Sequence, residues 1–250
     1  MQNLQGITAL VTGAGRRLGR SIAQTLADAG ASVAIHYGQT GDGAESLAEE
    51  IRGRGGQAEI FQADLADRQA VAALIPTITQ QLGPLGILIN SAAIFEKGDL
   101  TGNDWAQWQR HMAINLEAPV LLMQQFAQQW QVGEEASRPD GTGSIVNILD
   151  RRVLAPPTGH LAYNVAKSGL WTATRIAAAE LAPQIRVNGV GPGPILPAES
   201  DNPQRFNQIV ANTPMQRSGT PQEVAESVLF LVQHGYITGE LICVDGGEHL

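Results

Sequence analysis

A tyrosine and a lysine four residues apart form the clearest acid–base pair in this 250-residue chain. Tyr163 and Lys167 fall within a stretch of helical periodicity, so their side chains share one face of the expected helix. A lysine ammonium close to a phenol favours the phenolate and lowers the tyrosine pKa from its ordinary value of about 10. The pair therefore predicts that Tyr163 acts as a general acid–base.

Other polar residues stand where expected strands end. Asn90 ends one apolar run, Asp150 ends another, and Asn115 lies in the helical stretch that follows the first of them. Ligands of open parallel sheets bind outside the carboxyl ends of the strands, so these side chains are expected to converge there with the Tyr163 helix. We predict a catalytic set of Asp150, Tyr163, Lys167 and Asn115.

A glycine-rich turn joins the first expected strand to the first expected helix. Residues 12–19 read TGAGRRLG. In such a turn, backbone N–H groups and the helix N-terminus face a pyrophosphate. The spacing is not GxGxxG, because Leu18 occupies the third glycine position; it fits TGxxxGxG, with Arg17 in place of the middle glycine. The turn indicates a dinucleotide cofactor.

The residues after the second expected strand favour NADPH over NAD. An NAD site usually places a carboxylate there, against the ribose 2′-hydroxyl. Here that place holds His36, Tyr37 and Gly38, and the first acid is Asp42. Arg16 supplies a cation near the expected ribose, which would attract a 2′-phosphate.

Short β-branched runs alternate with helical stretches along the whole chain. This alternation predicts an α/β fold: a single-domain, Rossmann-type, doubly wound parallel sheet of about seven strands with helices on both faces, spanning residues 1–250. The strands are expected at residues 7–12, 32–37, 57–62, 85–90, 144–149, 185–190 and 240–245.

Helices are expected between these strands. Asp67 is a candidate N-cap for a helix that Pro76 should kink or shorten. Residues 133–143 and 189–203 are expected loops. The other helical stretches are residues 44–54, 101–130, 161–181 and 221–233.

Composition excludes several classes of function. The chain carries 24 acidic and 16 basic residues, a net charge of −8, which argues against binding to nucleic acid or an anionic membrane. Its one cysteine, Cys243, forms no internal disulfide or thiolate cluster, and no metal-ligand spacing occurs. There is no apolar stretch of about 20 residues and no signal-peptide pattern. We expect a soluble, cytoplasmic protein.

Taken together, these motifs resemble the short-chain dehydrogenase/reductase family over essentially the whole chain. The resemblance implies that Tyr163 protonates the substrate, that Lys167 lowers its pKa and bonds the nicotinamide ribose, and that Asn115 holds a relay water. It also implies a homotetramer. The matching segments are Thr12–Gly19, Asp64, Asn90–Ala93, Asn115, Tyr163, Lys167, Pro192–Gly193 and Asp245–Gly247. The expected cofactor contacts are Gly13, Arg16, Arg17, Leu18, His36, Tyr37, Asp64, Leu65, Asn90, Ala92, Tyr163, Lys167, Pro192 and Gly193.

Three residues narrow the resemblance to pteridine reductases. Most family members carry serine at the position of Asp150 and glycine at that of Arg17, whereas pteridine reductases carry Asp and Arg. Phe95 stands where those enzymes place an aromatic ring against a flat pterin. The resemblance implies that the substrate contacts Arg17, Phe95, Asp150 and Tyr163.

The chemistry of these side chains supports that narrower reading. A planar pterin suits stacking on Phe95, and its polar edge suits a carboxyl and a phenol. An ionised Asp150 would repel the alkoxide that forms when a ketone is reduced. We therefore predict an NADPH-dependent pteridine reductase acting on a C=N bond of a pterin, dihydropterin or folate, with a substrate lid at about residues 193–218.

Two alternatives stay open. The first is an NADPH-dependent carbonyl reductase of the same fold, acting on a 3-oxoacyl thioester or a sugar ketone; the second is a non-catalytic NADP-binding sensor. Asp150 could instead be a strand-end turn residue that pairs with Arg151 or Arg152, and Phe95 could be ordinary core.

Some residues are interpreted as structural. We expect His160 to be exposed, Cys243 to be buried core, and Trp105 with Trp108 to serve in packing or at an interface. A helical stripe is expected to be a close-packing face that includes part of a subunit interface; it comprises Ala162, Ala166, Leu170, Ala173, Ala177 and Leu181.

Overall fold

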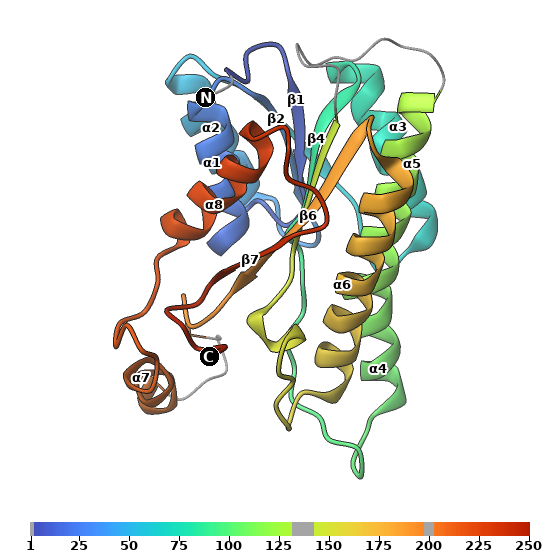
Figure 1. Cartoon of the computed structure of the whole chain (residues 1–250). Helices are drawn as coiled ribbons and strands as arrows, with labels where there is room; N and C mark the ends of the chain where they lie inside the picture. Colours follow the sequence, from blue (N-terminus) through green and yellow to red (C-terminus); the bar gives the residue numbers. More distant parts are fainter. Residues whose placement is uncertain (1–2, 132–142, 198–202) are drawn as a thin grey trace.

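The computed structural model describes residues 3–131, 143–197 and 203–250. Its centre is a seven-stranded sheet in the order β3-β2-β1-β4-β5-β6-β7, with every strand pair parallel (Figure 1). The strand order reverses beside β1, as in a doubly wound sheet. The strands are β1 (Thr8–Val11), β2 (Ser32–Tyr37), β3 (Gln57–Gln62), β4 (Leu85–Asn90), β5 (Gly143–Ile148), β6 (Ile185–Pro192) and β7 (Leu241–Val244).

Helices cover both faces of the sheet. Figure 1 shows α1, α2 and α8 on one face and α3, α4, α5 and α6 on the other, with α7 apart from both layers. The predicted fold class is confirmed. The helices are α1 (Arg17–Asp28), α2 (Asp42–Gly53), α3 (Arg68–Leu82), α4 (Trp105–Met112), α5 (Ala118–Gln131), α6 (Leu161–Leu181), α7 (Pro203–Ala211) and α8 (Pro221–Gln233), with a π-helical turn η1 (Ala113–Glu117) and a 3₁₀ turn η2 (Arg151–Val153).

The central strands are buried on both faces, which explains their continuous apolar sequence. In β4, Ile87 and Ile89 pack into the core beneath α1 and α8, while Leu88 packs into the core beneath α3 and α5. Successive side chains of a strand point to opposite faces, so both cores are filled by one run of residues.

Several helix boundaries differ from those expected. The helix expected from residue 101 begins at Trp105, because the side chain of Asp104 caps it by accepting a hydrogen bond from the N–H of Ala106 at 2.9 Å. The π-helical turn η1 then separates α4 from α5. Asp67 caps α3 as predicted, accepting from the N–H of Gln69.

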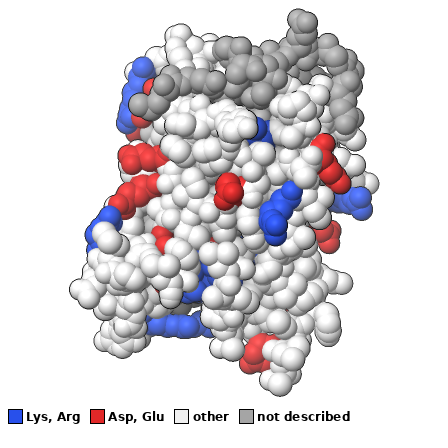
Figure 2. Space-filling model, viewed as in Figure 1, with Lys and Arg blue, Asp and Glu red and all other residues white. Residues whose placement is uncertain are grey.

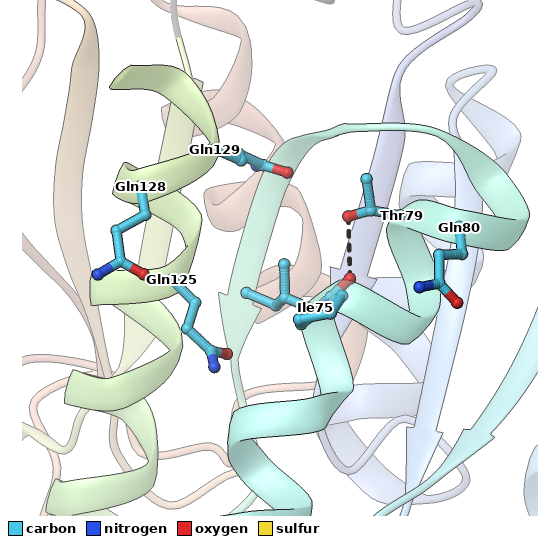
Figure 3. Close-up of a pocket in the computed structure, with 7 residues that line it drawn as sticks. Ile75, Thr79, Gln80, Gln125, Gln128 and Gln129 are labelled. Carbon is cyan, nitrogen blue, oxygen red and sulfur yellow. Dashed lines mark hydrogen bonds between the residues drawn. The ribbon is translucent and has the colours of Figure 1, made fainter. Parts of the chain in front are cut away.

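Pro76 does not shorten α3, which runs through it for 15 residues. Proline lacks the N–H that would bond the carbonyl four residues earlier, which is that of Ala72. Gln125 of α5 supplies the missing donor, because its Nε2 lies 2.6 Å from the oxygen of Ala72. Pro76 and Gln125 both line a surface hollow of about 450 Å³ between α3 and α5 (Figure 3).

The hollow in Figure 3 lies at the edge of the sheet where the strands begin. Gln129, also in its lining, bonds both the N–H and the carbonyl of Leu85, the first residue of β4. Ligands of open parallel sheets bind at the opposite, carboxyl edge. We therefore interpret the hollow as part of the α3–α5 packing.

The two segments that we expected to be loops also need comment. Strand β6 continues to Pro192, so the segment expected to be a loop from residue 189 is partly strand, and α7 lies within the predicted lid at 193–218. The other expected loop, 133–143, falls almost wholly outside the described residues, and Gly143 opens β5.

No helix in the described part of the chain is long and apolar enough to cross a membrane. On the face drawn in Figure 2, acidic and basic side chains are interspersed among uncharged ones.

Candidate active site

The glycine-rich turn lies tightly between β1 and α1, against the end of β4. A Cβ on Gly13, whose φ is +66°, would lie 3.0 Å from Cα of Ala92, and one on Gly19 would lie 2.3 Å from the oxygen of Gly13. The hydroxyl of Thr12 accepts hydrogen bonds from the N–H groups of Ser91 and Ala92 at 2.9 and 3.0 Å. Only glycine leaves space for this close approach of backbone to backbone.

His36 supports this turn from behind. The N–H of Gly13 donates to its Nδ1 at 3.1 Å, so Nε2 carries the proton and donates to the carbonyl of Ala63 at 3.0 Å. Burial lowers the pKa of His36 and keeps the ring neutral. Since its side chain is buried and both nitrogens are used, His36 is a positioning residue and not the cofactor contact that we expected.

Arg17 links the turn to the segment after β6. Its Nη2 donates to the carbonyls of Pro197 at 2.9 Å and Leu196 at 3.4 Å. Its φ of +51° is left-handed, which explains why glycine suits this position. The adjacent Arg16 is exposed beside α1. The expected contact of Arg17 with substrate or phosphate would have to replace these two bonds.

Asn90 presents an unsatisfied acceptor at the end of β4. Its Nδ2 donates to Oδ1 of Asn147 at 2.8 Å, and Asn147 in turn donates to the hydroxyl of Thr174 at 2.8 Å. Oδ1 of Asn90 is buried and has no hydrogen-bond partner among the described residues. Buried polar atoms are almost always paired, so this oxygen suits a hydroxyl of a bound ribose.

Asn115 holds the segment after β4 in place. Buried within η1, its Oδ1 accepts from the N–H of Ile94 and its Nδ2 donates to the carbonyl of Ile94, each at 2.9 Å. The side chain therefore bonds both polar groups of the backbone next to Phe95. The structure gives Asn115 a positioning role, and the relay water remains a prediction.

The remaining expected cofactor contacts lie around the same edge. Asp64 is exposed and accepts from the N–H of Ala66 at 2.9 Å, whereas Leu65 is buried in the core. Leu18 and Tyr37 are partly buried against the core beneath α1. After Pro192, Gly193 lies so close to Asp245 that a Cβ would come within 2.6 Å of it.

Asp150 and Tyr163 are brought into direct contact. The phenol of Tyr163 donates to Oδ2 of Asp150 at 2.9 Å. Asp150 is also the turn residue considered from the sequence: its Oδ1 caps η2 by accepting from the N–H of Arg152 at 2.8 Å, and Oδ2 lies 3.9 Å from Nε of Arg152. Arg151 instead pairs with Glu248.

This contact reverses the expected pKa shift of Tyr163. Burial, and then the negative charge and hydrogen bond of Asp150, raise the pKa of Tyr163 well above its ordinary value. The net shift is opposite to the lowering expected from Lys167, because a carboxylate beside a buried phenol disfavours the phenolate. Tyr163 is thus held protonated, as a proton donor must be.

Lys167 is buried behind Tyr163. Its Nζ donates to the carbonyl of Ile148 at 2.6 Å and lies 5.9 Å from the centre of the Tyr163 ring. Burial lowers the pKa of Lys167 to about 8, while Asp150 opposes that shift. Asp150, Tyr163 and Lys167 therefore lie together at the carboxyl end of β5 and the start of α6.

Phe95 contacts this site through its ring. It meets Tyr163 edge-on, with ring centres 4.7 Å apart and planes at 81°. His160 stacks on it at 4.1 Å, and the guanidinium of Arg152 lies over it at 4.8 Å. Phe95 is only partly buried, so it is not ordinary core.

The expectation that His160 is exposed is wrong, because it is buried with Nδ1 3.0 Å from the carbonyl of Glu96. Sequence reasoning missed the part that His160 and Arg152 play here. The available signals were spacings: three residues before Tyr163 and two after Asp150.

Three possible metal ligands come together near the C-terminus, although the sequence showed no metal spacing. Ligand atoms of Cys243, Asp245 and His249 lie within 4.8 Å of one another. Asp245, however, already accepts from the N–H of Gly247 and from His249, and burial raises the pKa of the Cys243 thiol to about 11. Cys243 is partly exposed rather than buried core, and we assign no metal here.

The expected close-packing stripe of α6 faces the chain's own core: Leu170 is buried there, and Ala173, Ala177 and Leu181 pack against it. The stripe therefore packs within the chain as predicted, and its expected part in a subunit interface stays a prediction. Trp105 and Trp108 contact each other edge-on, with ring centres 5.9 Å apart, and Trp105 is exposed.

Comparisons with known proteins agree with this fold. The family described as Enoyl-(Acyl carrier protein) reductase matches residues 13–249. The chain is 33% identical over 248 residues to the 3-oxoacyl-[acyl-carrier-protein] reductase FabG of Staphylococcus aureus, covering 97% of this chain and 98% of that protein.

Solved structures give the same answer. FolM alternative dihydrofolate reductase 1 from Brucella canis, complexed with NADP, superposes with a TM-score of 0.91 at 36% identity, covering 99% of this chain and 95% of that one. A blue fluorescent protein from a metagenomic library, in complex with NADPH, gives 0.89 at 34% identity and covers both chains fully (100% of each). The protein belongs to the short-chain dehydrogenase/reductase family and is an oxidoreductase.

Proposed function

We propose that this protein is an NADPH-dependent pteridine reductase that reduces a C=N bond of a pterin, dihydropterin or folate. The observation that carries the proposal is the 2.9 Å hydrogen bond from the phenol of Tyr163 to the carboxylate of Asp150. A carboxylate at this position is a poor neighbour for a developing alkoxide, but it is a good acceptor for the amino group of a pterin ring.

NADPH is the hydride donor. The glycine turn leads into the N-terminus of α1, where backbone N–H groups can bind a pyrophosphate, and the unsatisfied Oδ1 of Asn90 suits a ribose hydroxyl. The first acid after β2 is Asp42, and Arg16 stands beside the turn, so a 2′-phosphate is tolerated. The two solved relatives described above were crystallised with NADP or NADPH.

The residues of this chain would manage the proton. NADPH, when bound, supplies a hydride to the carbon of the C=N bond. Tyr163, held protonated, gives its proton to the nitrogen, which completes the two-electron reduction. The buried ammonium of Lys167 then stabilises the phenolate, since a cation favours the charged form of the phenol.

A carbonyl reductase is the second candidate. The observation in its favour is the 33% identity to a 3-oxoacyl-[acyl-carrier-protein] reductase over nearly the whole of both chains. Asp150 separates the two, because a serine there would donate a hydrogen bond to a ketone oxygen and the carboxylate does not. The family and the buried Tyr163–Lys167 pair favour either enzyme over an NADP-binding sensor.

The test is NADPH oxidation with 7,8-dihydrobiopterin, dihydrofolate and a β-ketoacyl thioester. We expect the two pterin-containing substrates to be reduced. Tyr163→Phe should lower kcat by about 10²–10⁴-fold without weakening NADPH binding, because only the proton donor is removed. Asp150→Ser should lose pterin reduction and preserve or raise ketone reduction. Oxidation with the thioester alone would show that the carbonyl-reductase reading is right.

A further inference from the structure

An arginine that no cofactor role accounts for lies inside the site. The side chain of Arg152 is only 18% exposed, and its Nη1 is buried without a hydrogen-bond partner among the described residues. Leaving a charged donor buried and unpaired costs free energy, so such groups usually have a partner in the working state. The described residues provide no hydrogen-bond partner for Nη1 of Arg152.

The neighbours of Arg152 place it at the substrate side of the site. Its guanidinium lies over the ring of Phe95, with 4.8 Å from Cζ to the ring centre, and Nε lies 3.9 Å from Oδ2 of Asp150. The same Oδ2 accepts the phenol proton of Tyr163. The guanidinium, the carboxylate and the phenol are therefore consecutive neighbours beside one aromatic ring.

Asp150 has spare capacity as an acceptor. Each of its oxygens accepts one hydrogen bond from the protein, Oδ1 from the N–H of Arg152 and Oδ2 from Tyr163. A carboxylate offers about four lone-pair positions, so it can accept further bonds. A ligand beside Phe95 would thus meet an acceptor, Asp150, next to a donor, Arg152.

We propose that Arg152 is a specificity-determining residue whose Nη1 donates a hydrogen bond to a ring oxygen of the substrate. Together with Asp150 it selects a flat heterocycle that presents an amino donor and an oxo acceptor, as the 2-amino-4-oxo edge of a pterin does. A simple ketone presents an acceptor only, so it can accept a hydrogen bond from Arg152 but offers no donor to Asp150. This inference rests on the proposed function and deepens it.

The test compares two ligands on two proteins. Binding of pterin and of 2-aminopteridine, which lacks the 4-oxo group, is measured by calorimetry on the NADP⁺-loaded wild-type enzyme and on Arg152→Gln. We expect the wild type to prefer pterin by about 10–100-fold, the range for a hydrogen bond to a charged donor, and the variant to lose that preference. Arg152→Lys, which keeps the charge but not the planar fork, should recover part of it.

A matched control removes one arginine elsewhere. Arg54 lies at the exposed end of α2 and pairs with Glu50, so Arg54→Gln should leave ligand preference and NADPH binding unchanged. In steady state, Arg152→Gln should raise KM for dihydrobiopterin by about 10–100-fold and lower kcat much less.

The outcomes separate this inference from the proposed function. If the wild type binds and reduces pterins but Arg152→Gln keeps the full preference for pterin, the assignment of Arg152 is wrong and the function stands. If Arg152→Gln weakened NADPH binding as much as pterin binding, Arg152 would have a structural role and the assignment would also be overturned. If the wild type neither binds nor reduces pterins, the proposed function fails, and the role of Arg152 fails with it.

Discussion

The phenol of Tyr163 faces three different groups: the carboxylate of Asp150, the ammonium of Lys167 and the ring of Phe95. The carboxylate and the burial hold the phenol protonated, and the same carboxylate raises the pKa of Lys167 against the larger effect of burial. Asp150 therefore acts, after burial, on the pKa of both catalytic partners, which a neutral serine at that position would not do.

This coupling predicts the pH dependence of the reaction. Lys167 has a pKa of about 8 and is needed as a cation, so kcat/KM at saturating NADPH should fall as the pH rises through that value. In Asp150→Asn the carboxylate no longer favours the ammonium, so the pKa of Lys167 falls and the alkaline limb should move to lower pH. Tyr163, with a pKa well above 10, does not titrate in this range.

The measurement is the pH profile of kcat/KM in the wild type and in Asp150→Asn. Asp150→Ser, which also removes the charge, is the matched comparison and should shift the limb in the same direction. An alkaline limb that stays in place, or moves to higher pH, would contradict this account.

At the scale of elements, polar side chains that bond backbone groups carry the site. The segment after β4 is held by Asn115 through Ile94, and it pairs with the start of α6, where the N–H of Leu161 donates to the carbonyl of Gly98 at 3.0 Å. Phe95 on that segment and Tyr163 on α6 are thus fixed relative to each other by main-chain bonds.

Replacing Asn115 tests whether it positions this segment. Asn115→Ala leaves the N–H and carbonyl of Ile94 without their partner, so we expect a loss of about 1–3 kcal/mol in the free energy of unfolding. KM for the substrate should rise more than the Kd for NADPH, because Phe95 is adjacent to Ile94. Denaturant unfolding and steady-state kinetics measure both. A large fall in kcat with unchanged stability would instead favour the water-relay role.

The bond between Gln125 and Ala72 makes a second prediction for an element. Gln125→Ala should destabilise the protein by about 0.5–1.5 kcal/mol, because Pro76 leaves the Ala72 carbonyl without a helical donor. In a Pro76→Ala background the helix supplies its own N–H, so the same change should cost less. A double-mutant cycle by urea unfolding measures the difference, and equal costs in both backgrounds would refute the explanation.

At the scale of the whole molecule, exposed apolar side chains lie on one side of the helical layer. Val165 and Ile176 of α6 are 42% and 53% exposed, and their spacing places them on one face of the helix. Val120 of α5 is 39% exposed. We expect subunits to meet at these exposed residues.

We expect the protein to form a homotetramer through this surface. Light scattering after size exclusion should give a tetramer for the wild type and a smaller species for Ile176→Lys, because a charge at the centre of an apolar contact is costly to bury. Tyr236→Lys is the control, since Tyr236 is fully exposed outside these helices. A wild-type monomer, or an Ile176→Lys tetramer, would refute the interface.

Local patterns in the sequence predict the class of fold and the edge of the sheet at which the site lies. Strand and helix periods, together with parallel β–α alternation, require a doubly wound sheet, whose carboxyl ends bring Asn90, Asp150 and Tyr163 to one edge. These conclusions depend on local patterns and on a topological rule, so no contact had to be known in advance.

The role of each side chain at that edge depends on contacts made in the folded structure. The neutral support by His36, the bonds of Arg17 to the segment after β6 and the raised pKa of Tyr163 all depend on burial and on partners distant in sequence. Gln125, which is 49 residues from Pro76 in the sequence, bonds the carbonyl that Pro76 leaves without a helical donor. This bond also depends on the packing of two helices. Charge, desolvation and hydrogen-bond pairing act through distances in space, which sequence spacing does not encode.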